Sequence, residues 1–163
     1  MNQKVLVTYA SRAGSTMEVA QAVAQELTNR GYAVDIRPVK QVTSIDGYNA
    51  VVIGSAVRMS NWLPEAVQFV EKNRTALSQK KTAYFGLYLM NMGEDEASRK
   101  ARDLYLDAAR KLVKPQAEAL FPGVGDPSKV SFLDRLIGKM VKSPEGDFRD
   151  WKAIRAWAQG IEL

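Results

Sequence analysis

The chain has 163 residues, of which 46% are hydrophobic and 25% charged, so a single globular domain with its own core is expected. Cysteine and histidine are both absent, which excludes disulfides, thiolate nucleophiles and the commonest metal ligands, and we expect no metal site. The formal net charge of +5 fits either a solubilising surface excess or an anionic partner. An enzyme without these residues is expected to take its chemistry from a cofactor.

The first predicted element is a buried strand over residues 4–9, followed by a helix over residues 15–30 that ends at Gly31. Between them lies a turn with three hydroxyl groups, Ser11-Arg12-Ala13-Gly14-Ser15-Thr16, which opens directly into the helix. Such a turn suits a phosphate, because a helix N-terminus offers N–H groups and partial positive charge. The alternative is a capped turn that binds nothing.

The next elements are a strand over residues 33–39, a turn over residues 44–48 and a strand over residues 50–55 that is apolar on both faces. The loop after this central strand supplies the candidate residues Ser55, Ala56, Val57, Arg58 and Trp62. A tryptophan in such a loop can cover a planar ring of a ligand. The alternative is that it covers the helix predicted to begin at residues 63–64.

A fourth strand is predicted over residues 82–88, and the loop that follows offers Tyr88, Leu89 and Asn91. Its backbone could bind the polar edge of a flat ring, or it could be a connector whose methionines fill gaps in the core. The remaining pattern predicts a long helix over residues 94–114, a short strand over residues 118–121 and a final helix over residues 150–159.

Strands that alternate with helices predict an α/β fold, in which a parallel sheet is covered on both faces. Five strands in about 120 residues favour the doubly wound order 2-1-3-4-5, in a three-layer sandwich formed by one domain over residues 1–163. Sheets of this kind bind ligands beyond the carboxyl ends of their strands. We therefore expect the three candidate loops to meet at one edge.

An insertion is predicted at about residues 123–147, before the last helix, and residues 128–142 have the pattern of a basic amphipathic helix. Its apolar positions recur with helical period: Phe132, Leu133, Leu136, Ile137, Met140 and Val141. Four cations flank a single acid, Asp134: Lys129, Arg135, Lys139 and Lys142. The helix either packs on the domain or presents an apolar face to a partner or a lipid surface through residues 129–142.

The chain resembles the flavodoxin family over residues 3–122 and 150–160. The phosphate loop of that family, Thr/Ser-x-Thr-Gly-x-Thr, is matched by Ser11, Gly14 and Thr16, whereas Ala13 lacks the third hydroxyl and Ser15 could replace it. The resemblance implies an FMN cofactor, with its phosphate at residues 11–16 and its ring between the later two loops. It implies this set of cofactor-binding residues: Ser11, Arg12, Ala13, Gly14, Ser15, Thr16, Ser55, Ala56, Val57, Arg58, Trp62, Tyr88, Leu89 and Asn91.

Two short segments also resemble the menaquinone-dependent protoporphyrinogen oxidase branch of this family. They are residues 53–58, Ile-Gly-Ser-Ala-Val-Arg, and residues 132–137, Phe-Leu-Asp-Arg-Leu-Ile. The resemblance implies an FMN oxidoreductase that oxidises protoporphyrinogen IX or a similar reduced substrate, with a quinone as electron acceptor. Arg58 and Tyr88 are the candidate catalytic residues. Alternatives are an electron carrier that docks a redox-partner protein, and a non-catalytic binding module.

Location and partners follow from simple exclusions. No apolar run approaches the ~20 residues that span a bilayer, and no signal-peptide pattern precedes Lys4, so we expect a cytoplasmic protein. Residues 129–142 are the place where peripheral membrane contact could occur. Nucleic acid is not an expected partner, because the basic residues are not interleaved with exposed aromatics. The sequence does not indicate the oligomeric state.

Overall fold

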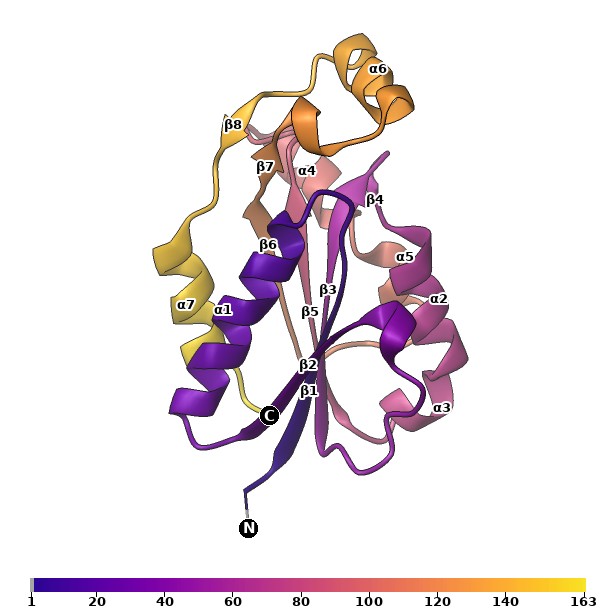
Figure 1. Cartoon of the computed structure of the whole chain (residues 1–163), viewed down its shortest axis with the longest axis vertical. Helices are drawn as coiled ribbons and strands as arrows, with labels where there is room; N and C mark the ends of the chain where they lie inside the picture. The colour runs from indigo at the N-terminus through magenta and orange to yellow at the C-terminus, as the bar shows by residue number, and fades with distance from the viewer. Residues whose placement is uncertain (1) are drawn as a thin grey trace.

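The computed structural model describes residues 2–163 and contains a central parallel sheet (Figure 1). Its strands lie in the order β2-β1-β3-β5-β6. They are β1 (Lys4–Ala10), β2 (Ala33–Pro38), β3 (Ala50–Arg58), β5 (Lys81–Tyr88) and β6 (Ala117–Pro122). The short β4 (Asn61–Trp62) turns back antiparallel on β3 and lies off this path. The predicted order 2-1-3-4-5 is therefore confirmed, because β4 pairs only with the end of β3 and is not one of the five parallel strands.

Helices cover both faces of the sheet (Figure 1). On one face α1 (Ser15–Asn29) packs with α7 (Trp151–Gly160), and on the other lie α2 (Pro64–Lys72), α3 (Arg74–Leu77) and α5 (Asp107–Arg110). Alternate strand residues serve the two cores: Val5 and Val7 face α1, whereas Leu6 faces α2. A 3-10 turn, η1 (Val39–Gln41), follows β2. The three-layer sandwich thus consists of strands whose alternate side chains enter the two cores, and of amphipathic helices that cover each face.

The long helix predicted over residues 94–114 is wrong. The chain forms α4 (Glu96–Asp103) and then α5, with a break at residues 104–106. Tyr105 and Leu106 are both 1% exposed, whereas Leu104 is 59% exposed. The break turns Tyr105 inward, where its hydroxyl donates a hydrogen bond to the Met90 carbonyl and accepts one from the Asn91 side chain. These contacts with the preceding loop accompany the interruption of the predicted helix.

The third strand is longer than predicted. It continues beyond residue 55 to Arg58 and pairs with β4 through a tight turn at Met59 and Ser60. Both turn residues have positive φ, 52° and 63°. Two-residue hairpin turns of this handedness usually contain glycine or asparagine, and this sequence shows neither at those positions.

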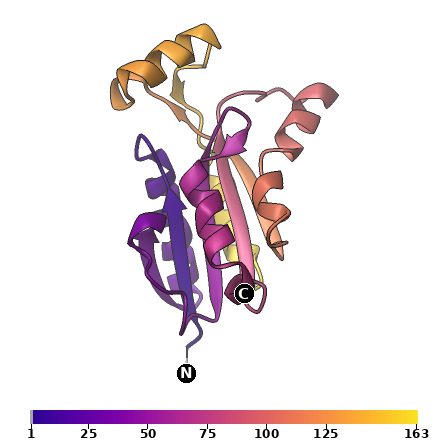
Figure 2. The same ribbon diagram turned by 90° about the vertical axis from the view of Figure 1, so that its right-hand side faces the viewer.

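The insertion forms a small separate unit above the carboxyl edge of the sheet (Figure 2). It contains β7 (Val124–Gly125), the 3-10 turn η2 (Pro127–Lys129), α6 (Phe132–Met140) and β8 (Gly146–Asp147), and β7 pairs with β8. The predicted extra helix before the last one is confirmed, although α6 is shorter than residues 128–142. No residue of α6 is buried, and Phe132 and Met140 are 77% and 76% exposed. Its apolar side chains therefore do not pack on the domain core.

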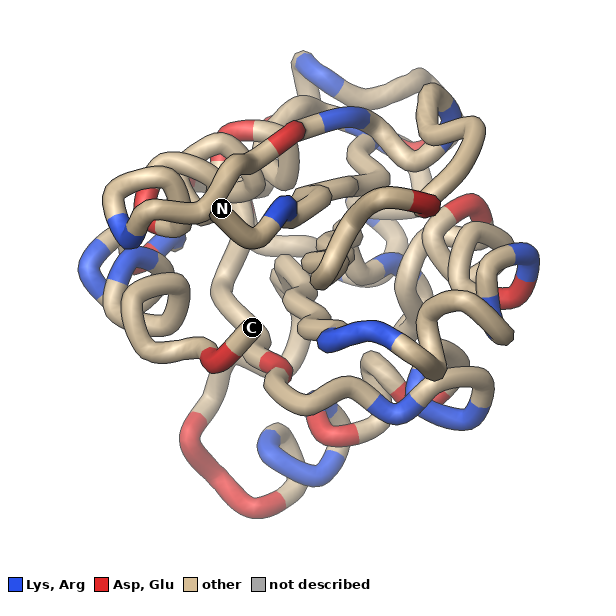
Figure 3. The backbone as a smooth tube through the Cα atoms, turned by 90° about the horizontal axis from the view of Figure 1, so that it is seen from below, with Lys and Arg blue, Asp and Glu red and all other residues tan. Residues whose placement is uncertain are grey.

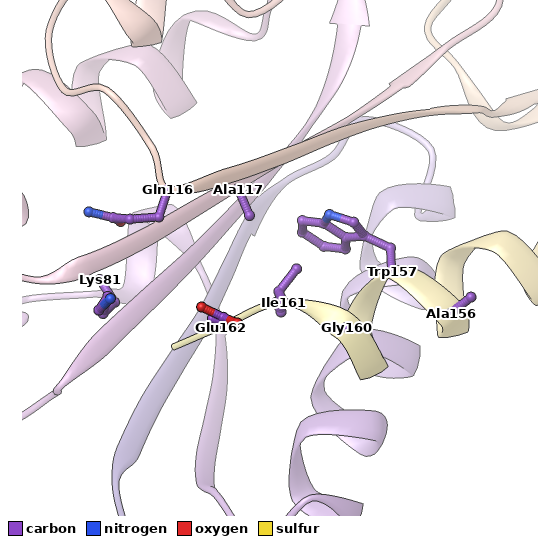
Figure 4. Close-up of a pocket in the computed structure, with 8 residues that line it drawn as sticks. All are labelled: Lys81, Gln116, Ala117, Ala156, Trp157, Gly160, Ile161 and Glu162. Atoms are coloured by element: carbon purple, nitrogen blue, oxygen red, sulfur yellow. The ribbon is translucent and has the colours of Figure 1, made fainter.

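The opposite end of the molecule carries both chain termini (Figure 1). A shallow recess of about 550 Å³ lies there, lined in part by Lys81, Gln116 and Trp157 (Figure 4). Because Lys81 and Ala117 begin β5 and β6, this recess is at the amino edge of the sheet. Seen from this end, acidic and basic positions are interspersed around the perimeter (Figure 3). Within residues 2–163, no helix combines the length and apolarity that a bilayer crossing requires.

Candidate functional site

Three loops meet at the carboxyl edge of the sheet. β1, β3 and β5 are neighbours, and their register pairs Ala10 with Ser55 and Ala56 with Leu87. Because parallel strands end at the same edge, residues 11–16, the β3–β4 turn and residues 89–95 all emerge there. The insertion stands over the same edge (Figure 1). The topology thus brings together the three loops that the sequence singled out.

The first loop contains several groups that are open to an anion. Gly14 has φ +91° and precedes α1, and no atom lies within 4 Å of where a Cβ would stand. The helix N-terminus receives no side-chain cap, because Ser11 Oγ instead accepts a hydrogen bond from the Gly14 N–H at 2.9 Å. Thr16 is fully buried, and its hydroxyl has no partner in the described residues 2–163. Uncapped N–H groups and an unpaired hydroxyl fit a phosphate.

Arg12, in contrast, is paired with a carboxylate of the protein. Its guanidinium makes a two-pronged contact with Glu65, in the first turn of α2. This hydrogen bonding lowers the pKa of Glu65. Arg12 therefore joins the phosphate loop to the neighbouring helix. Sequence reasoning missed Glu65, because an acid in the first turn of a helix is explained by the helix dipole alone.

In the second loop, the Ser55 hydroxyl is hydrogen-bonded within the β3–β4 segment itself. The buried hydroxyl of Ser55 accepts a hydrogen bond from the Leu63 N–H at 3.0 Å and donates one to the Ala56 carbonyl at 2.8 Å. Ala56 and Val57 lie in β3 and are partly buried. These residues give the β3–β4 hairpin a fixed shape at the edge of the sheet.

Trp62 lies in the hydrophobic core. It is 2% exposed, and its ring meets that of Tyr84 edge to face at a centroid distance of 4.9 Å. This placement matches the alternative in which the indole covers the start of α2, and it leaves no ring face on the surface. The indole N–H is buried without a partner in the described part of the chain.

Arg58 connects the second loop to the insertion. Its guanidinium forms an ion pair with Asp134 of α6. The hydrogen bond from Arg58 is the main reason that the pKa of Asp134 is lowered. Asp134 is the single acid among residues 128–142, so this contact neutralises it and leaves cations on the rest of that segment. Sequence reasoning did not identify this partnership.

In the third loop, Tyr88 is 8% exposed, and burial raises the pKa of its phenol. Its ring lies 6.1 Å from that of Tyr105, with the planes tilted. Leu89 is half-buried, whereas Asn91 is exposed, has φ +61° and donates a hydrogen bond from Nδ2 to the Tyr105 hydroxyl at 2.7 Å. Tyr105 therefore helps to fix the shape of this loop. Sequence reasoning did not identify this role, because it placed Tyr105 inside a continuous helix.

Comparisons with known proteins agree with this architecture. Over 174 aligned residues the chain is 23% identical to the protoporphyrinogen IX dehydrogenase [quinone] of Escherichia coli K12, covering 97% of this chain and 94% of the relative. A short-chain flavodoxin associated with a bacterial microcompartment superposes with a TM-score of 0.61, at 19% identity and 97% and 95% coverage. Two-electron reduced Megasphaera elsdenii flavodoxin gives a TM-score of 0.56, at 16% identity and 96% and 99% coverage.

The family assignment rests on a match along most of the chain. The profile of a flavodoxin domain matches residues 6–152, from the first strand to the start of the last helix. The match includes the insertion as well as all three loops. The chain therefore belongs to the flavodoxin family, as an FMN-binding flavoprotein.

Proposed function

We propose that this protein is an FMN-dependent, quinone-linked oxidoreductase that oxidises protoporphyrinogen IX or a similar reduced substrate. The observation that carries the proposal is the insertion, whose apolar helix stands above the cofactor edge with its side chains uncovered. An electron carrier needs an exposed ring edge but no such wall. The full-length similarity to a quinone-linked dehydrogenase supports the same reading.

Each residue at the edge has a task in this proposal. The N–H groups at the start of α1 and the hydroxyl of Thr16 hold the phosphate of FMN, and the loops after β3 and β5 enclose its ring. FMN, when bound, supplies an acceptor and donor of two electrons. Arg58 is already paired with Asp134 of α6, so in this proposal it holds the insertion beside the ring. Burial raises the pKa of the Tyr88 phenol, so it stays protonated at neutral pH and can donate a hydrogen bond, but it cannot act as a base.

The overall reaction balances without further reactants. In each cycle the substrate loses two electrons and two protons, and the quinone gains them to become the quinol. Since histidine and cysteine are absent and the Tyr88 phenol stays protonated, the protons released by the substrate pass to solvent.

The decisive experiment uses the purified chain loaded with FMN under anaerobic conditions. We expect protoporphyrinogen IX to bleach the flavin absorbance and a menaquinone analogue to restore it. A protein that cannot be loaded with FMN contradicts the cofactor assignment. A loaded protein that ignores the porphyrinogen but exchanges electrons with a reductase supports the alternative, a flavodoxin-type carrier.

The proposal also includes a surface, on α6, through which the protein reaches a quinone in the membrane. The outer side of α6 exposes Phe132, Leu136 and Met140, and the cations of residues 129–142 surround them. Apolar side chains within a basic rim match an anionic lipid surface, where quinones reside. We therefore assign α6 as a peripheral membrane contact.

Vesicle sedimentation tests this contact. Leu136→Glu should weaken binding to vesicles of phosphatidylglycerol and phosphatidylcholine about tenfold or more, because the charge replaces a side chain that enters the lipid. Leu104→Glu is the matched control, since Leu104 is also exposed but lies on the α4 side. FMN affinity should be unchanged in both variants. Equal vesicle binding by the two variants would contradict the assignment.

A further inference from the structure

The loop at residues 89–95 has no regular secondary structure. Three of its carbonyl groups nevertheless accept hydrogen bonds from the side chains of Arg102 and Tyr105. The Tyr105 hydroxyl donates a hydrogen bond to the Met90 carbonyl at 3.1 Å. Arg102 of α4 donates from Nη1 to the carbonyls of Asn91 and Gly93, the latter at 2.6 Å. Three carbonyls in four residues are therefore held by side chains of one neighbouring segment.

The N–H groups of the same residues have the opposite arrangement. Within residues 2–163, no hydrogen bond from the backbone N–H groups of residues 90–93 is formed. Residues 90, 91 and 93 are exposed. Because the carbonyls are engaged and the N–H groups are not, the loop leaves unpaired donors at the carboxyl edge of the sheet, where it emerges. A backbone of this kind suits a ligand with an electron-rich edge.

Arg102 is well suited to hold the loop. Its side chain is 12% exposed, and its guanidinium lies 5.6 Å from the centroid of the Tyr88 ring. A planar guanidinium carries its donors in a rigid fork, so it holds two carbonyls beside a ring in a more fixed geometry than a lysine ammonium on its flexible stem. The break between α4 and α5 then lets Tyr105 turn inward and hold the third carbonyl.

We propose that Arg102 is a positioning residue, which fixes residues 90–93 as a donor surface for the electron-rich edge of the flavin ring. The inference rests on the proposed function, because it concerns the loop that would face FMN. Arg102 acts through the backbone of this loop. Its charge also favours added negative charge on a neighbouring ligand, so its removal should make reduction of the bound cofactor harder.

The test compares Arg102→Met and Arg102→Lys with Arg99→Met. Arg99 lies on the same helix, but its side chain is 62% exposed. In the cofactor-free chain, we expect the backbone order parameters of residues 90–93 to fall in Arg102→Met from about 0.85 to below about 0.6. FMN affinity should fall about tenfold or more, and the reduction potential should become more negative. Arg99→Met should leave all three measurements at their wild-type values.

Arg102→Lys separates geometry from charge, and it also serves if Arg102→Met fails to fold. The lysine variant should have a reduction potential close to that of the wild type, because the positive charge remains. The order parameters of residues 90–93 should still fall, because the guanidinium geometry is lost. Wild-type order parameters and FMN affinity in the Arg102 variants would overturn the inference. If the wild-type chain does not bind FMN, the proposed function fails, whereas the order parameters still decide whether Arg102 positions the loop.

Discussion

At the residue scale, two fully buried threonines with unpaired hydroxyls differ in whether a ligand could supply the missing hydrogen bond. Thr8 lies inside β1 and Thr16 lies at the start of α1, and neither hydroxyl has a partner in the described residues 2–163. A buried hydroxyl without a partner costs stability. At Thr16 the cost coincides with an uncapped helix N-terminus, where a bound phosphate would remove it. Thr8 instead lies within the strand, two residues before its end, where no helix N-terminus offers N–H groups.

These two threonines give a matched pair of substitutions. Thr16→Val should weaken FMN binding about tenfold, because a hydrogen bond to a charged phosphate is lost, without loss of stability in the cofactor-free chain. Thr8→Val should leave FMN binding unchanged and should not lower stability either. Fluorescence titration of FMN and urea unfolding measure the two effects. Identical FMN affinities in the two variants would exclude a role for the Thr16 hydroxyl.

The site could be predicted in part from single residues. The hydroxyl-rich turn at residues 11–16 was identifiable because helix N-termini that bind phosphate have a local sequence pattern. The partners Glu65 and Asp134 were not, since they lie 53 and 76 positions from the arginines that they bind. Trp62 illustrates the same limit, because its sequence position does not reveal that its ring lies on Tyr84 in the core.

At the element scale, a close approach between β3 and β5 shapes the core. Gly54 pairs with Phe85, and a Cβ at Gly54 would stand 1.9 Å from the phenyl ring. The glycine lets this ring lie across β3 and reach Trp157 of α7, at a centroid distance of 6.0 Å. The last helix is thus packed against the sheet through a contact that depends on a missing side chain.

Gly54→Ala should therefore be destabilising. We expect the free energy of unfolding to fall by about 1–3 kcal/mol, because the methyl group displaces Phe85 in a packed core. Gly160→Ala is the control, since nothing lies within 4 Å of its Cβ position in α7, and its effect should stay within about 0.5 kcal/mol. Urea unfolding followed by circular dichroism measures both. Equal stability of the two variants would mean that Phe85 can move at no cost.

The elements themselves were largely predictable, for a physical reason. The central strands are apolar on both faces and α1 has a regular stripe, so local pattern and tertiary position agree. The failure at residues 94–114 has the opposite cause. There Tyr105 is drawn inward by its bonds to Met90 and Asn91, and this tertiary demand overrides a helical pattern that is consistent by itself.

At the scale of the whole molecule, the ion pair between Arg58 and Asp134 helps to tie the insertion to the domain and should make that tie depend on pH. The pKa of Asp134 is lowered by Arg58, so its contribution is present above the ordinary value of 3.8 and is lost as pH falls through the folded value. At neutral pH, Asp134→Asn should speed hydrogen exchange in α6 about twofold to fivefold.

The ratio of exchange rates between Asp134→Asn and wild type should approach one in acid, after correction for intrinsic exchange. Asp103→Asn controls for the change in net charge, because Asp103 is exposed and lies on α4. A ratio that stays constant from neutral pH to below the folded pKa would show that the carboxylate does not hold α6.

The two-stranded ribbon of β7 and β8 has a consequence for how this domain can be altered. Because Gly125 lies opposite Gly146, the twenty residues between them leave and re-enter the fold at one point. We expect that replacing this segment with a tight turn would preserve the strand order and both cores, because no residue of 126–145 belongs to either core. Such an excised chain, and the reciprocal graft onto a plain flavodoxin, would show which properties of the protein depend on residues 126–145 and which depend on the rest of the domain.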